Sequence, residues 1–146
     1  YPFDALISHN RMTVLNRSAA EMFDYAHTQG IAILNAAPFA GGVLAKGSAV
    51  TQKVTYQDVD QKALEPVRRI EELCAQHGVS PGAVALQFSM RQPSVTSTML
   101  GVTKPERIAQ TLEWASMDIP QALWYALDAL PYETEDPEAN RVYNPG

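Results

Sequence analysis

The chain has 146 residues, of which 46% are hydrophobic and 18% charged, and its formal net charge is −5. This length and apolar content suit one globular domain with its own core, and the negative charge argues against a surface that neutralises the phosphates of a nucleic acid. No apolar run approaches the roughly 18 residues that span a bilayer, and a lone cysteine, Cys74, cannot form an internal disulfide. We therefore expect a soluble cytoplasmic protein in which Cys74 is a buried structural thiol.

The first half of the chain alternates strand and helix signals. Residues 3–8 predict a strand, and Ser18 followed by Glu21 has the spacing of a capping box that opens a helix ending near Gly30. Residues 31–37 are almost continuously apolar, which is typical of a strand covered on both faces. The polar stretch 46–60 predicts a long surface loop.

The second half continues the alternation. An apolar stripe predicts a helix over 63–77, and Ser80–Pro81 predicts the start of another that runs to about residue 92. Residues 95–100 are β-branched and apolar enough for a strand, and Thr103 with Glu106 suggests a second capping box before a helix. A last helix is expected over 120–130. The remaining residues, 131–146, form a tail whose acidic part, 133–136, we expect to be solvated or mobile.

This order of elements predicts an α/β fold in which parallel strands are joined by right-handed helical crossovers. Residues 1–146 form one domain in this interpretation, but three strands cannot close a barrel and leave two bare sheet edges. The chain also begins at Tyr1, almost directly in a strand. We therefore expect a partial domain that lacks structure on its N-terminal side.

The segment 98–107 is the strongest candidate binding site. A strand passes through Gly101 into a helix start that carries Lys104 and Arg107. Glycine permits close approach of a ligand to the backbone, and free amides at a helix N-terminus together with two cations attract a phosphate. A capped surface helix whose lysine and arginine face water explains the same residues equally well. Neither a P-loop nor a Gly-x-Gly-x-x-Gly sequence is present.

The same segment resembles the last barrel strand and following helix of the aldo-keto reductase family. The resemblance implies that this stretch holds the adenosine phosphate end of NADP or NAD. Lys104 and Arg107 together suit a 2′-phosphate, so NADP is the first choice. Gln110 and Thr111 stand where the family usually has Glu-Asn. The replacement departs from the residues with which the family contacts the adenine of the cofactor. The cofactor-binding residues implied here are Gly101, Val102, Thr103, Lys104, Arg107, Gln110 and Thr111.

A second stretch, residues 31–46, resembles the seventh strand and its following turn in the same family. The resemblance implies that the turn lies along the cofactor pyrophosphate and ribose. Ala36 replaces a tyrosine that many members stack on nicotinamide, which is similar to the branch that oxidises free sugars, such as galactose and threo-aldose dehydrogenases. Residues 8–15 and 78–87 also match, so the resemblance covers nearly all of 3–115. The cofactor-binding residues implied here are Pro38, Phe39, Ala40, Gly41 and Leu44.

The family resemblance implies a (β/α)8 TIM barrel, of which this chain supplies about strands 6–8, and an NAD(P)-dependent oxidoreductase that interconverts carbonyls and alcohols, including an aldose-to-lactone reaction. Barrel enzymes often bind phosphates on the loops after strands 7 and 8, which fits the two turns above. The family's catalytic tetrad comes from the first four strands, so we assign no catalytic residue here. The expected partners are a small carbonyl or sugar substrate, the missing N-terminal half of the barrel and a second copy in a homo-oligomer.

Other side chains and other functions carry weaker signals. His9, His27 and His77 lack the paired spacing of metal ligands, so no metal site is predicted, although His9 lies at a strand end where barrel active sites open. Two alternatives stay open. The chain could belong to a non-catalytic, cofactor-sensing regulatory subunit with the same barrel, or it could be a small domain that dimerises and binds another phosphate ligand.

Overall fold

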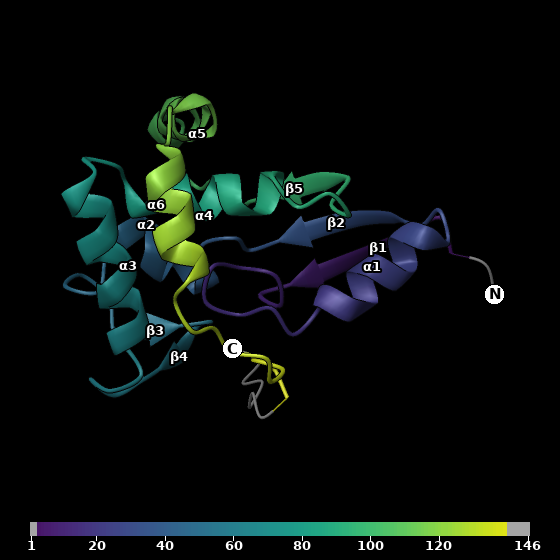
Figure 1. The fold of residues 1–146 in the computed structure, drawn as a ribbon, viewed down its shortest axis with the longest axis horizontal. Coiled ribbons are helices and arrows are strands. Elements are labelled where there is room, and N and C mark those ends of the chain that lie inside the picture. Colours follow the sequence, from purple (N-terminus) through teal and green to yellow (C-terminus); the bar gives the residue numbers. More distant parts are fainter. Residues whose placement is uncertain (1–2, 140–146) are drawn as a thin grey trace.

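The computed structural model describes residues 3–139, and three parallel strands form its centre (Figure 1). β1 (Ala5–His9) pairs with β2 (Ala32–Ala36), which pairs with β5 (Ser97–Met99). The crossover from β1 to β2 contains α1 (Ala20–Thr28). The predicted α/β class and the predicted parallel pairing are therefore confirmed.

The long connection from β2 to β5 contains most of the remaining elements. The strand predicted over 95–100 is shorter than expected. The helices predicted over 63–77, from Ser80–Pro81 to about residue 92, and over 120–130 begin and end within two residues of the expected positions. No end was predicted for the helix after residue 103. The elements between β2 and β5 are η1 (Ala40–Gly42), α2 (Val43–Lys46), β3 (Lys53–Val54), β4 (Gln57–Asp58), α3 (Glu65–Gln76) and α4 (Pro81–Met90). After β5 come α5 (Glu106–Ser116) and α6 (Gln121–Asp128). None of the described helices is long and apolar enough to cross a membrane.

Both predicted capping boxes are wrong. The Ser18 hydroxyl and amide donate to Asn16 Oδ1, so Ser18 belongs to a turn, and α1 begins after Ala19 without a side-chain cap. α5 begins after Pro105, again without a side-chain cap. The Ser80–Pro81 start is confirmed, because Ser80 Oγ accepts a hydrogen bond from the Gly82 amide at 3.2 Å.

The predicted surface loop over 46–60 contains a β-hairpin, β3–β4, instead of irregular chain. Its tip, Thr55 and Tyr56, has positive φ angles of 49° and 68°. The tip packs on the turn after β2, since the Thr55 amide donates to the Ala40 carbonyl at 3.0 Å. A Cβ at Gly41 would lie 2.6 Å from the Tyr56 nitrogen, so only glycine permits this close approach.

The two faces of the central sheet differ. Side chains alternate along each strand, so Ile33 and Asn35 of β2 point to the helix-covered face, where both are fully buried. The Asn35 amide donates to Ser89 Oγ of α4 at 2.8 Å. On the opposite face Ile7 is 63% exposed and Met99 is 42% exposed. Among the described residues, the outer edges of β1 and β5 have no strand partner.

The C-terminal segment returns to the connection that follows β1. The Glu133 amide donates to the Leu15 carbonyl at 2.9 Å, and the Arg17 amide donates to the Glu133 carbonyl at 2.8 Å. The Asn16 side chain donates to the Glu135 carbonyl at 2.8 Å. The side chains of 133–136 are exposed, as expected for a solvated segment, and the backbone of this segment is hydrogen-bonded to residues 15–17. Residues 140–146 of the predicted tail lie outside the described residues.

Candidate cofactor-binding site

The carboxyl ends of β2 and β5 lie side by side, because Ala36 pairs with Met99 in register. The turns that follow these two strands enclose a single cavity of about 330 Å³. This places the two sequence segments, 31–46 and 98–107, at one site. The predicted residues that line the cavity are Pro38, Phe39, Gly41, Gly101, Val102, Thr103, Arg107, Gln110 and Thr111.

Three predicted residues are not part of the cavity lining. Ala40 and Leu44 are 1% and 2% exposed and belong to the hydrophobic core. Their side chains pack in the core beneath the turn and do not line the cavity. Lys104 is exposed but does not line the cavity, whereas Arg107 does. Lys104 and Arg107, which were predicted to bind the same phosphate, therefore have different surroundings.

Lys46 and Tyr56 line the cavity and were not predicted. Lys46 closes α2, and its Nζ lies 3.8 Å from the place that a Cβ of Gly42 would occupy, so its side chain folds back over the turn. The four-residue spacing from Gly42 to Lys46 is one helical turn and could have indicated this. Within residues 3–139 neither Lys46 nor Arg107 forms an ion pair. Both ammonium and guanidinium groups therefore add positive charge to the cavity.

The start of α5 supplies fewer free amides than expected. The Arg107 amide donates to the Lys104 carbonyl and the Ile108 amide donates to the Pro105 carbonyl, each at 3.0 Å. The Thr111 hydroxyl donates to the Arg107 carbonyl at 2.7 Å. The attraction of this end of the cavity for an anion therefore comes mainly from side-chain cations and from the exposed backbone that precedes the helix.

Aromatic packing fixes the inner wall of the cavity. Phe39 and Trp114 both line it and meet edge to face, with ring centroids 5.8 Å apart and an interplanar angle of 71°. Trp114 also lies directly on Gly82 of α4, where a Cβ would come within 2.4 Å of the indole ring. The two turns are thus joined through α5 and α4 by close packing.

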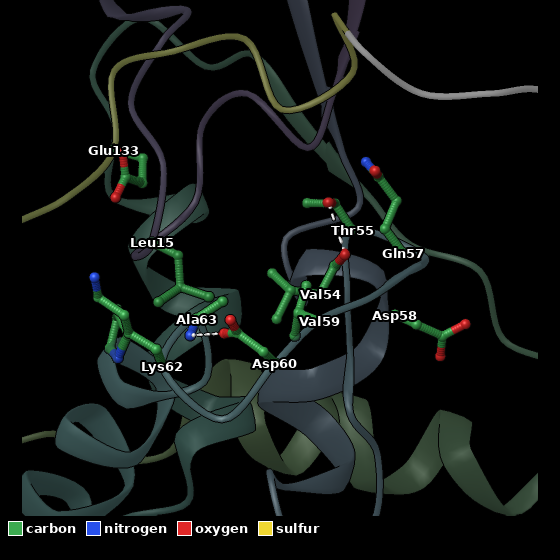
Figure 2. A pocket seen from close by; sticks show the side chains of 11 residues that line it. Leu15, Val54, Thr55, Gln57, Asp58, Val59, Asp60, Lys62, Ala63 and Glu133 are labelled. Carbon is green, nitrogen blue, oxygen red and sulfur yellow. Dashed lines mark hydrogen bonds between the residues drawn. The ribbon is translucent and has the colours of Figure 1, made fainter.

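A larger cavity, of about 570 Å³, lies between the hairpin, the connection after β1 and the start of α3. Figure 2 shows Leu15, Val54 and Val59 near its middle and Asp58 and Lys62 at opposite sides. Asp60 already accepts a hydrogen bond from the Ala63 amide at 2.8 Å. No predicted site residue lines this cavity, and it lies away from the ends of β2 and β5.

The cysteine and the histidines offer no separate reactive site. Cys74 is fully buried, and its pKa is raised from 9.0 to about 12, first by burial and second by the nearby Glu71 carboxylate, so its thiol is unreactive at neutral pH. The expectation of a buried structural thiol is confirmed. Among residues 3–139, no cluster of histidine, cysteine and carboxylate side chains has the geometry of a metal site.

The sequence profile of the aldo/keto reductase family matches residues 2–131. The chain belongs to the aldo/keto reductase family. This confirms the family that segments 31–46 and 98–107 indicated in the sequence.

Three curated proteins that are named as dehydrogenases or oxidoreductases resemble the chain. Pyridoxal 4-dehydrogenase of Microbacterium luteolum is 30% identical over 125 residues, which are 85% of this chain and 36% of that protein. D-threo-aldose 1-dehydrogenase of a Pseudomonas species is 28% identical over 126 residues, 85% of this chain and 38% of that protein. An uncharacterised oxidoreductase of Bacillus subtilis is 25% identical over 119 residues, 78% and 36% respectively. The chain thus spans little more than a third of the length of these relatives.

Proposed function

We propose that this chain supplies the cofactor-phosphate end of an NAD(P)-dependent oxidoreductase that interconverts carbonyls and alcohols. In this proposal the chain forms about strands 6–8 of a (β/α)8 barrel, and the remaining strands carry the acid and base groups. NADP is the preferred cofactor. D-threo-aldose 1-dehydrogenase, by its name, oxidises an aldose, and we extend a sugar substrate, oxidised to its lactone, to this protein as part of the proposal.

The observation that carries the proposal is the single cavity between the turns after β2 and β5. It contains Lys46 and Arg107, and its volume of about 330 Å³ is at the lower end of the range for small-molecule sites. A Cβ at Gly101 would meet no atom within 4 Å, so the space beside this glycine is open to a ligand. These residues fit the phosphate and ribose part of a dinucleotide.

The residues have distinct roles in the proposed site. Arg107 and Lys46 hold phosphate charge, the backbone at Gly101 permits close approach, and the Phe39–Trp114 wall excludes water from one side. The cofactor, when bound, supplies the hydride. Ala40 and Leu44 set the shape of the turn from the core. This chain contributes binding and orientation, which determine where the cofactor lies relative to the reacting carbonyl.

Replacement of the cavity cations tests the proposal. Loss of a charge-assisted hydrogen bond costs about 1.5–3 kcal/mol, so Arg107→Gln should raise the dissociation constant for NADPH at least tenfold, measured by NADPH fluorescence in the full-length protein. The effect on NADH should be smaller, because NADH lacks the 2′-phosphate. Lys104→Gln, outside the cavity lining, should change the constant only about threefold.

Lys62→Gln, which removes the same charge at the remote cavity, serves as the matched control and should leave the constant unchanged. The cofactor assignment is wrong if Arg107→Gln and Lys62→Gln bind NADPH equally well.

A further inference from the structure

The larger cavity, between the hairpin, the connection after β1 and the start of α3, has no role in the proposed cofactor site (Figure 2). Its volume of about 570 Å³ falls in the range of small-molecule sites. It shares Leu15 and Pro66 with a cavity of about 250 Å³ between α3 and the end of α6. The two cavities adjoin each other at these residues, and together we call them the hairpin groove. None of the residues that line it lines the cofactor cavity.

Apolar side chains form the floor of the hairpin groove. Leu15, Val54 and Val59 are partly buried against the core, and Figure 2 shows them near the middle of the first cavity. In the second cavity the lining includes Val14 and Ile70, which are 5% and 2% exposed. A ligand with an apolar body would remove more of this surface from water, and the hydrophobic effect favours such binding.

Hydrogen bonds hold the walls of the groove in place. The Leu15 amide donates to Thr13 Oγ1 at 3.2 Å, and the Leu15 carbonyl accepts from the Glu133 amide at 2.9 Å. On the hairpin side, the Val59 amide donates to the Gln52 carbonyl at 3.0 Å. The groove therefore needs no rearrangement to accept a ligand, which lowers the entropic cost of binding.

The first cavity carries more negative than positive charge. The carboxylates of Asp58, Asp60 and Glu133 line it together with a single lysine, Lys62. Asp60 accepts a backbone hydrogen bond, which leaves its negative charge in place. Asp58 and Lys53 are 3.8 Å apart with both side chains exposed, so water screens this ion pair. Carboxylates at the edge of an apolar surface attract a cation and repel an anion.

The adjoining cavity adds apolar surface without net charge. The charged residues that line it are Glu65 and Arg69, whose side chains form an ion pair at 3.7 Å and so balance each other. Leu130 and Pro131 extend its apolar lining. The hairpin groove thus has one acidic part and one neutral, apolar part. This division matches a ligand that has a cationic head and an apolar tail.

We propose that the hairpin groove binds a small organic cation in which an ammonium group is joined to an apolar chain. The ammonium group lies among the carboxylates of Asp58, Asp60 and Glu133. The apolar chain covers Leu15 and extends toward Ile70. This site goes beyond the proposed oxidoreductase function and does not rest on it, because the groove and the cofactor cavity share no residue.

Titration with matched ligands tests this site. Hexylammonium, hexanol and hexanoate share one chain and differ in the charge of the head group at neutral pH. In full-length protein labelled with ¹⁵N, hexylammonium should shift the Leu15 and Val59 amide signals saturably. Hexanol should bind about fivefold more weakly, and hexanoate at least about tenfold more weakly. Butylammonium should bind at least about fourfold more weakly than hexylammonium, because it buries two fewer methylene groups.

Charge variants separate the acidic part from the apolar floor. Asp58→Asn combined with Glu133→Gln should weaken hexylammonium binding about fivefold and leave hexanol binding unchanged. Lys62→Gln should strengthen hexylammonium binding about twofold, because it removes a repelling charge. Asp24→Asn combined with Glu113→Gln removes two exposed carboxylates outside the groove and is the matched control, so it should leave all these constants unchanged.

Three results would overturn the cation site. They are equal binding of hexylammonium and hexanoate, equal hexylammonium binding by the Asp58 and Glu133 double variant and its control, and a groove filled by a second copy of the protein. The last would appear in analytical ultracentrifugation as a dimer that Leu15→Asp dissociates and that hexylammonium does not. The double variant should bind NADPH normally. Failure of the unaltered protein to bind NADPH would contradict the cofactor proposal alone, since the hexylammonium titration needs no cofactor.

Discussion

Three glycines in this structure have different reasons to be glycine. A Cβ at Gly41 would collide with the hairpin backbone, and one at Gly82 would collide with the indole of Trp114. At Gly101 the same atom would meet nothing within 4 Å, and the backbone there does not have a positive φ. Only at Gly101 is the absence of a side chain unexplained by the protein itself. The proposed cofactor, which would approach the backbone at this glycine, accounts for it.

This comparison gives a direct prediction for Gly101→Ala. The free energy of unfolding should change by less than about 0.5 kcal/mol, since the methyl group enters open space. The dissociation constant for NADPH should rise about tenfold, because the same methyl group occupies the proposed position of the cofactor. Urea denaturation and NADPH fluorescence measure the two effects.

Gly82→Ala is the contrasting variant and should lose about 1–3 kcal/mol of stability through overpacking against Trp114. Unchanged NADPH binding in Gly101→Ala would show that no ligand lies against this glycine.

At the scale of elements, the strands and helices were predictable but their connections were not. The apolar run 31–37 and the Ser80–Pro81 start have strong local signals, and the strand and the helix start that they predict are confirmed. The expected covering of both strand faces is not present among the described residues, where only the face of Ile33 and Asn35 is fully buried. The hairpin was missed because its tip, Thr55–Tyr56, contains none of the Gly or Asn residues that mark such turns. Its conformation depends on packing against the turn at Ala40. The hydrogen bond from the Asn10 side-chain amide to Glu138 was missed for a related reason, since the two residues are 128 positions apart.

In the two segments of the proposed cofactor site, 31–46 and 98–107, the residue types were likewise predictable, but the detailed geometry was not. Their residue types indicated a phosphate site, and the cavity brings most of them together. Lys46 joins the site only because α2 turns its side chain back over Gly42, whereas Lys104 falls outside the lining because of the direction in which α5 begins. These details depend on how the elements pack, which local sequence does not specify.

The C-terminal segment should respond to acid. The pKa of Asp136 is lowered from 3.8, first by the hydrogen bond from the Glu138 amide and then by Arg11. A carboxylate whose pKa is lowered in the folded protein stabilises the folded arrangement above its unfolded value, and this contribution is lost as the pH falls through the lowered value. The Glu138 amide signal in ¹⁵N NMR should therefore titrate with a midpoint below 3.8.

Arg11→Gln should move that midpoint upward, since it removes the second cause of the lowered pKa, and Asp136→Asn should abolish the transition. A midpoint at or above 3.8 in the unaltered protein would show that the segment does not hold Asp136 as described.

At the scale of the whole molecule, one sheet face is packed and the other is open. Ile33 is buried under the helices, whereas Ile7 on the opposite face is 63% exposed. The proposed barrel would cover Ile7 with side chains of the remaining strands and would pair the free edges of β1 and β5. The family match and the fraction of its relatives that the chain spans both support this arrangement.

The open face predicts a difference between two forms of the protein. In the chain of residues 1–146 alone, Ile7→Ser should change the free energy of unfolding by less than about 0.5 kcal/mol, because Ile7 is largely exposed. In the complete barrel the same change should cost at least about 2 kcal/mol, because Ile7 is then buried. Chemical denaturation of both forms measures this.

Ile33→Ser is the control and should destabilise both forms strongly, as its side chain is buried in either case. Equal small effects of Ile7→Ser in the two forms would mean that the open face is not the interior of a barrel.

The pairing of Arg11 with Asp136 joins residues 125 positions apart. During synthesis, the connection that follows β1 emerges from the ribosome long before its partner segment exists. Its hydrogen bonds to that segment can therefore form only after residue 136 has been synthesised, and the rim of the sheet is completed as a late step of folding. Removal of residues 133–138 would leave that step without its closing partner even though β1, β2 and β5 had already been made.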